Sequence, residues 1–99
     1  MNTIEYLNLA KEKLGITSDY ALAQRLGVTR SYMSKLMAGK CHLSDELAQA
    51  VAAIIGFHSG IVVLDMHRQR ATSPADVNLW NEIYKGFLTL LLPAKRTLA

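Results

Sequence analysis

Apolar residues recur at intervals of three and four along most of the chain, which is the period of amphipathic helices. Asn2 can cap a first helix, Glu5 stands three residues later as a capping box requires, and Gly15 can end the helix. We therefore expect a helix over residues 3–14. Its apolar row consists of Ile4, Leu7, Ala10 and Leu14.

Five further segments have the same layout, with capping residues at the start and, in most of them, glycine or proline at the end. The clearest start is Ser73-Pro74 followed by Asp76, and Pro93 prevents that helix from continuing. No segment predicts a strand convincingly, so the fold class is all-α, a bundle of about five to six helices. The five helices are expected from Ser18 to Gly27, from Thr29 to about Ala38, from Ser44 to Gly56, from about Ser59 to about Arg70 and from Ser73 to about Leu92.

The stretch Leu47–Leu64 contains no charged residue and is about as long as a short membrane span. Gly56 and Gly60, with His58 and Ser59 between them, interrupt its middle with residues that end and start helices. Two packed helices joined by a turn explain this stretch better than a membrane span, so we expect no membrane partner.

The segment from Ser18 to Gly39 predicts a helix-turn-helix. Ala23 is small enough for two helices to cross closely, and Gly27 allows a sharp turn between them. Apolar residues at helical spacing would fill the space between the two helices: Leu22, Leu26, Val28, Met33 and Leu36. The exposed positions of the second helix are then Arg30, Ser31, Tyr32, Ser34 and Lys35. They are cationic or hydrogen-bonding and include no acid, which suits a DNA major groove flanked by phosphates.

This pattern resembles the Cro- and lambda-repressor-like helix-turn-helix regulators, over about Asn2 to Gly56. The residues that carry the resemblance are Leu22-Ala23, Gly27-Val28, Met33-Ser34, Leu36, Gly39, Leu43-Ser44, Leu47, Val51-Ala52 and Ile55-Gly56. A phage-related subgroup is more similar still. Its features here are Ser18–Ala23, Arg70-Ala71, Pro74 and Leu79-Trp80.

The resemblance implies a lambda-repressor-like fold and gives roles to residues of the second helix. Arg30 and Lys35 are the candidates for guanine edges, and Lys40 for the DNA backbone. The full predicted DNA-binding set is Thr29, Arg30, Ser31, Tyr32, Ser34, Lys35 and Lys40. Two features depart from the family. Asp19 stands where many members carry a phosphate-contacting Gln, and Cys41-His42 follow Lys40 in place of Pro and a second basic residue. The alternative is that these cations form an ordinary solvated helix face.

The last predicted helix carries an apolar row at alternating spacings of three and four, which is typical of a coiled-coil seam. The row consists of Val77, Trp80, Tyr84, Phe87 and Leu91. It either packs on this chain's own core or forms a dimer interface, and we expect the dimer. The predicted organisation is a helix-turn-helix domain over residues 1–57, a helical dimerisation extension over 58–93 and a frayed tail over 94–99.

Composition adds modest constraints. The 99 residues carry a formal net charge of +3, which favours an anionic partner without establishing one. Cys41 is the only cysteine, so no internal disulfide forms, and the chain begins without a secretory signal. We therefore expect a cytoplasmic protein, in a bacterial cell or a phage-infected host.

Residues with potential chemistry do not form a recognisable catalytic or metal-binding set. Cys41, His42, His58 and His67 match no common zinc spacing, and no catalytic triad or phosphate-binding glycine loop is present. We expect no enzyme activity, no metal, no cofactor and no small-molecule ligand. The predicted function is a dimeric repressor of phage or prophage type that binds double-stranded DNA at a near-palindromic operator. The alternative is an antitoxin-like or anti-regulator interaction module that binds a partner protein through Phe87–Leu92.

Overall fold

The computed structural model describes residues 1–91, which form six α-helices and no strand. The helices are α1 (Thr3–Leu14), α2 (Asp19–Leu26), α3 (Arg30–Met37), α4 (Asp45–Ile55), α5 (Ser59–Arg70) and α6 (Pro74–Leu91). The all-α prediction is confirmed, and each helix lies where the sequence pattern places it. The predicted end of the last helix near Leu92 and the predicted tail over 94–99 lie outside the described residues.

The helix ends follow from local sequence. At α1 the capping box is complete: Asn2 Oδ1 accepts a hydrogen bond from the Glu5 amide at 2.8 Å, and the Asn2 amide donates to Glu5 Oε1 at 2.8 Å. The side chains of Ser18, Thr29 and Ser44 each accept from the amide three residues later. These caps satisfy amides that the helices leave unpaired, so each start is fixed locally.

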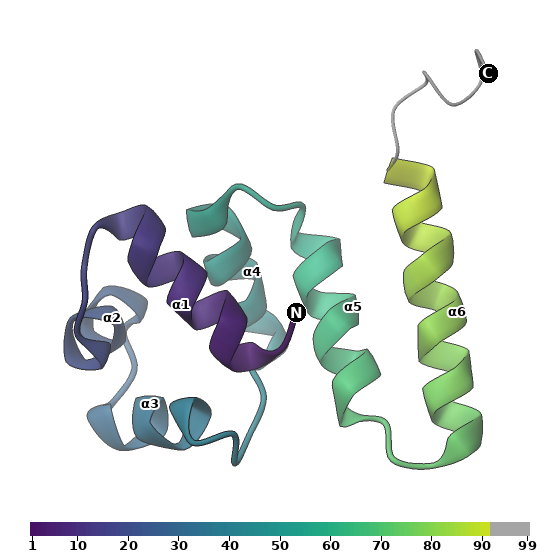
Figure 1. The fold of residues 1–99 in the computed structure, drawn as a ribbon, viewed down its shortest axis with the longest axis horizontal. Coiled ribbons are helices and arrows are strands. Elements are labelled where there is room, and N and C mark those ends of the chain that lie inside the picture. The colour runs from purple at the N-terminus through teal and green to yellow at the C-terminus, as the bar shows by residue number, and fades with distance from the viewer. Residues whose placement is uncertain (92–99) are drawn as a thin grey trace.

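Helices α1 to α5 enclose one apolar core, and α6 lies alongside α5 at one side of it (Figure 1). Helix α5 contributes Val62 and Met66 to this core, so the core crosses the predicted domain boundary at residue 57. Tyr6 is also buried, although the predicted row on α1 did not include it. The largest fully buried apolar side chains are Tyr6, Leu7, Leu22, Met33, Leu36, Leu43, Val51, Val62 and Met66.

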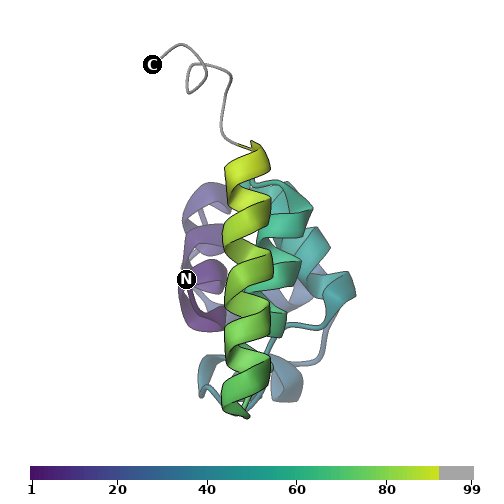
Figure 2. The ribbon, with the colours of Figure 1, turned by 90° about the vertical axis from the view of Figure 1, so that its right-hand side faces the viewer.

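Helix α6 runs antiparallel to α5, as the two views of the ribbon show (Figures 1 and 2). None of its residues is buried, although it is 18 residues long. Its rings contact polar side chains of α5. Trp80 stacks on His67 with 4.8 Å between the ring centroids, and the Arg68 guanidinium carbon lies 4.7 Å from the centroid of the Tyr84 ring. Helix α6 is therefore held at one face by ring contacts rather than enclosed by apolar side chains.

A buried carboxylate joins α1 to α5. Asp65 is fully buried; its Oδ2 accepts from Tyr6 Oη at 2.7 Å and from the Met1 amino group at 3.1 Å. Its Oδ1 accepts from Arg68 Nε at 3.0 Å and from Gln69 at 3.2 Å. Burial alone raises the Asp65 pKa, but these hydrogen bonds outweigh it and hold the pKa below its ordinary value. Burial and the bond to Asp65 raise the pKa of Tyr6.

Among residues 1–91, no helix is both long enough and apolar enough to cross a lipid bilayer. The uncharged stretch Leu47–Leu64 is divided between α4 and α5, as the sequence predicts. Gly56 ends α4 in the left-handed conformation, with φ of 77°, and His58 caps α5.

Candidate nucleic-acid interface

Helices α2 and α3 lie at the edge of the core that is remote from α6 (Figure 1). Leu22 and Ala23 of α2 are buried against the core, as are Met33 and Leu36 of α3. Gly27, between the helices, has φ of 72°, a conformation that a residue with a side chain adopts only at a cost. One side of α3 is thus fixed by packing, and its opposite side faces outward.

The outward side of α3 carries four of the predicted DNA-binding side chains: Arg30, Ser31, Ser34 and Lys35 are exposed. Thr29 is exposed as well, and its hydroxyl oxygen accepts from the Tyr32 amide at 3.0 Å as the helix cap. These residues are brought together because positions 30, 31, 34 and 35 share one face at the helical period.

Tyr32 departs from the expected pattern, because it is half-buried rather than exposed. It packs against the core and borders a hollow of about 440 Å³ that Val28 and Leu47 also line. Glu46 lies at the same hollow. Tyr32 therefore lies at the margin of the outward face of α3, where its ring is partly covered by the core.

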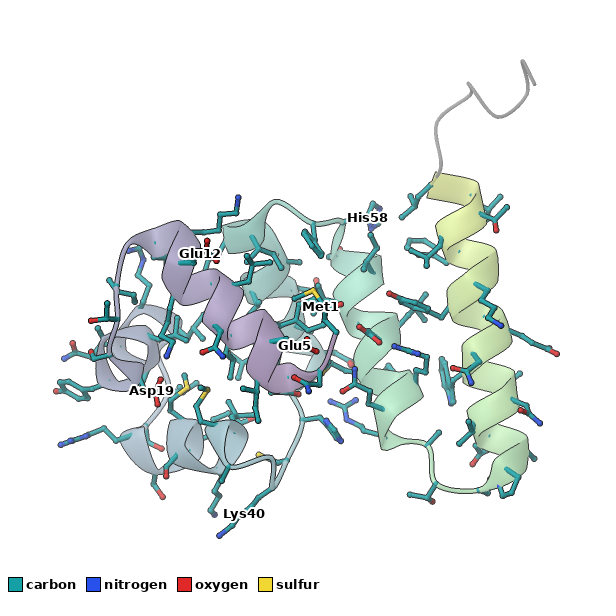
Figure 3. The ribbon with its side chains drawn as sticks, in the orientation of Figure 1. Met1, Glu5, Glu12, Asp19, Lys40 and His58 are labelled. Carbon is teal, nitrogen blue, oxygen red and sulfur yellow. The ribbon has the colours of Figure 1, made fainter. Side chains whose placement is uncertain are left out.

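Lys40 extends the cationic surface beyond the end of α3. It is exposed, and its side chain points away from the core at the same edge of the molecule (Figure 3). The Lys40 amide donates to the Lys35 carbonyl at 3.0 Å, which ties the residue to the last turn of α3. With Arg25 on α2, four exposed cations, Arg25, Arg30, Lys35 and Lys40, belong to the helix-turn-helix and its C-terminal loop.

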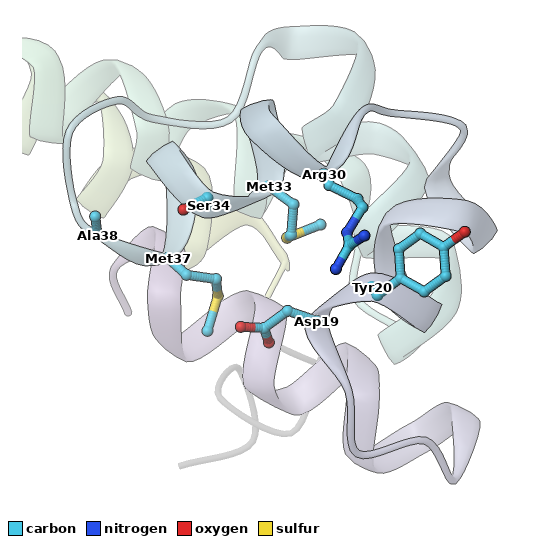
Figure 4. A pocket seen from close by; sticks show the side chains of 7 residues that line it. All are labelled: Asp19, Tyr20, Arg30, Met33, Ser34, Met37 and Ala38. Atoms are coloured by element: carbon cyan, nitrogen blue, oxygen red, sulfur yellow. The ribbon is translucent and has the colours of Figure 1, made fainter.

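Asp19 is the acid in the first turn of α2, where the sequence raised the question of repulsion from phosphate. Its Oδ1 accepts from Lys11 Nζ at 2.7 Å, so a cation of α1 is paired with it. Asp19 also lines a hollow of about 370 Å³ between α2 and α3 (Figure 4). The other lining residues are Tyr20, Arg30, Met33, Ser34, Met37 and Ala38.

Tyr20 is a residue of this surface that the sequence interpretation missed. It is 48% exposed, and the Arg30 guanidinium carbon lies 4.6 Å from its ring centroid. Gln24 Nε2 donates to Tyr20 Oη at 3.0 Å. Tyr20 and Arg30 belong to different helices, so neither the periodicity nor the composition of the sequence predicts that they meet.

The residues predicted for a dimer interface lie on α6. Four of them are half-buried: Val77, Trp80, Tyr84 and Phe87. The rings of Trp80 and Tyr84 contact α5, and the ring of Phe87 contacts His58, its N-cap. Phe87 comes so close to α5 that a Cβ added at Gly60 would lie 2.6 Å from the ring. Leu91 is 39% exposed. A different row of α6 is open to a partner: Leu79, Ile83 and Leu90, which are 49%, 39% and 83% exposed.

The residues considered for metal binding are dispersed. His42 lies by Thr3, the His58 ring accepts from the Gly60 amide, and His67 lies between Asp45 and Trp80. In the described part of the chain, no three histidine, cysteine or acidic side chains gather as metal ligands would.

No protein-family model, curated protein or solved structure matches this chain. The resemblance to Cro- and lambda-repressor-like regulators therefore stays an interpretation of the sequence. The function has to be argued from the residues and geometry of this surface.

Proposed function

We propose that this protein is a sequence-specific DNA-binding regulator with a lambda-repressor-like helix-turn-helix, in which α3 is the recognition helix. The observation that carries the proposal is the outward face of α3. This face presents Arg30, Ser31, Ser34 and Lys35 without an acid, on a helix whose other face is fixed in the core. Such a rod offers hydrogen-bond donors and positive charge to base edges in a major groove.

The side chains of this face divide into two roles. Arg30 and Lys35 are long cations that donate to guanine O6 and N7, where a good pair of contacts discriminates between bases by about 1–3 kcal/mol. Ser31 and Ser34 are short and donate to bases or phosphates close to the helix axis. Lys40 and the hydroxyl of Thr29 contact the backbone and set the register of the helix.

A second copy of the chain completes the proposed regulator. A two-fold dimer presents two recognition helices to half-sites about 34–36 Å apart, which requires a near-palindromic operator. The apolar row Leu79, Ile83 and Leu90 on α6 is exposed, and no residue among 1–91 fills the space at Gly86 on the same side. In an antiparallel pair of α6 helices centred between Tyr84 and Lys85, Leu79 faces Leu90 of the other copy and Ile83 faces Gly86. The two surfaces complement each other, since a large side chain meets an open glycine.

The same exposed row supports a second candidate function, an interaction module whose α6 binds an amphipathic helix of another protein. The two candidates differ in the recognition helix: only the regulator needs Arg30 and Lys35. They also differ in the state of the pure protein, which is a dimer for the regulator and a monomer for the module.

The test of DNA binding starts from in-vitro selection of bound duplexes. Arg30→Ala is expected to weaken binding to the selected duplex by about five- to 150-fold, the equivalent of 1–3 kcal/mol, and to weaken binding to random duplex much less. Lys13→Ala removes an exposed cation of α1 and serves as the control, with little change in the ratio of the two affinities. Absence of any duplex binding at low ionic strength would contradict the proposal, as would equal losses on both duplexes.

The dimer is tested by sedimentation of the pure protein. Ile83→Glu places a charge in the exposed row and is expected to give monomers, whereas Asn78→Glu, on the same helix outside the row, leaves the dimer intact. A wild-type protein that is monomeric and does not bind DNA would favour the interaction module.

A further inference from the structure

The first turn of α2 brings an aromatic ring against a side chain of α3. Tyr20 and Arg30 are both exposed, and the guanidinium carbon lies over the ring at 4.6 Å from its centroid (Figure 4). This geometry is that of a cation–π contact. The contact crosses the gap between two helices and fixes a side chain of one relative to the other.

The ring is itself held in place from its own helix. Gln24, one turn later on α2, donates to Tyr20 Oη at 3.0 Å. Asp19, the acid beside the same hollow, is paired with Lys11 at 2.7 Å. The Arg30 guanidinium therefore lies against an oriented ring, while the neighbouring carboxylate is partnered by another cation.

The contact with the ring does not use up the hydrogen-bond donors of the guanidinium. A guanidinium that packs its flat face on a ring keeps its N–H groups in its own plane, where they can donate to other acceptors. The described residues include no hydrogen-bond or ion-pair partner of the Arg30 guanidinium, so these donors face solvent. A long arginine loses rotamer freedom when it binds a base edge, and a side chain already ordered by a ring loses less.

We propose that Tyr20 is a positioning residue for base recognition: it holds the Arg30 guanidinium ready for a guanine edge in the major groove. The proposal rests on the proposed function of α3 and extends it to a residue outside the recognition helix. Tyr20 sets how strongly Arg30 prefers its base, and it reads no base itself.

The experiment compares two substitutions of Tyr20 on matched duplexes. The base pair read by Arg30 is first identified as the position at which Arg30→Ala loses preference in the selection experiment. Binding is then measured to the selected duplex and to the duplex changed at that one base pair. Tyr20→Leu is expected to reduce the preference between the two duplexes by about two- to fivefold, which is the strength of an exposed cation–π contact. Tyr20→Phe keeps the ring that Arg30 contacts but loses the hydrogen bond from Gln24, and it is expected to restore most of the preference.

The same substitutions in an Arg30→Ala background separate positioning from a structural role. There Tyr20→Leu is expected to change nothing at that base pair, because no guanidinium remains to be positioned. Circular dichroism checks that each variant folds, which the exposure of Tyr20 favours.

Each outcome bears on a different claim. A loss with Tyr20→Leu that Tyr20→Phe restores and that vanishes without Arg30 supports the positioning role. Equal weakening on both duplexes, an unchanged preference, or the same loss in the Arg30→Ala background overturns it, while the proposed function survives. Failure of the wild-type protein to bind duplex DNA overturns the proposed function instead.

Discussion

The body formed by α1 to α5 and the helix α6 are stabilised in different ways. The body buries apolar side chains from each of its five helices in one core, and at one edge of this core it holds a fully buried carboxylate with several donors. Helix α6 buries no residue and contacts α5 through three aromatic rings, one of which meets a cation. Helices of both regions, such as α1 and α6, have apolar residues at helical spacing, so periodicity alone does not tell how deeply a helix is buried.

The difference matters for the proposed function. The proposed recognition helix α3 belongs to the body, so its outward side chains are carried on a rigid support. Helix α6 keeps an apolar row on its open side, where a second copy can cover it. We expect substitutions in α6 to change the stability of the body little. Substitutions in the contacts between α6 and α5 are expected to loosen α6 itself.

The largest expected effect concerns the core of the body. Leu36→Ala removes a fully buried side chain of α3 and is expected to lower the free energy of unfolding by about 3 kcal/mol, through lost burial and a cavity. Leu79→Ala makes the same change on α6, where the side chain is 49% exposed, and is expected to alter it by no more than about 0.5 kcal/mol. Urea unfolding measures both, at a protein concentration at which the chain is monomeric. Equal losses would show that the two regions are buried alike.

The next effect concerns the buried carboxylate. Asp65→Asn removes the charge that Arg68 and the Met1 amino group pair with, and it is expected to lower the free energy of unfolding by about 2 kcal/mol at neutral pH. Urea unfolding at pH 7 measures this loss. A variant as stable as the wild type would mean that the carboxylate contributes nothing net to joining α1 and α5.

The contribution of Asp65 to stability depends on pH in a way that follows from its pKa. Hydrogen bonds hold this pKa in the folded protein below the ordinary value of 3.8, so the carboxylate adds stability above that pH. This stability is lost as the pH falls below about 4 and through the folded-state pKa. The gap between wild type and Asp65→Asn is therefore expected to narrow at acid pH. A gap that widens there would contradict the assignment.

The smallest effect concerns α6 alone. Tyr84→Leu removes the ring that faces Arg68 and is expected to weaken the attachment of α6 by about 0.5–1 kcal/mol. Amide hydrogen exchange should then accelerate in α6, with little change in α1 to α4, because α6 opens without unfolding the body. Acceleration spread evenly over all helices would show that α6 and the body unfold as one unit.

Much of the candidate interface could be read from the sequence, since it depends on one helix and its period. The exposure of Arg30, Ser31, Ser34 and Lys35 follows from their spacing once Met33 and Leu36 are placed inside. Tyr32 was expected to be exposed too, but it is half-buried against the core, beside a hollow that residues of α4 also line. Whether a residue at the margin of a helix face is covered depends on a neighbouring helix, which the period of its own helix does not reveal.

The order and the ends of the helices were determined by the sequence itself. Residues a few positions apart decide them, because caps and left-handed glycines act through local hydrogen bonds and local sterics. The capping box of Asn2 and Glu5 and the turn at Gly27 are examples. The tertiary structure decided which distant groups meet: Asp65 with Tyr6, Tyr20 with Arg30, and the rings of α6 with α5. Those pairs depend on how whole helices pack. Packing energy is the sum of many small contacts between side chains, so no single position in the sequence determines it.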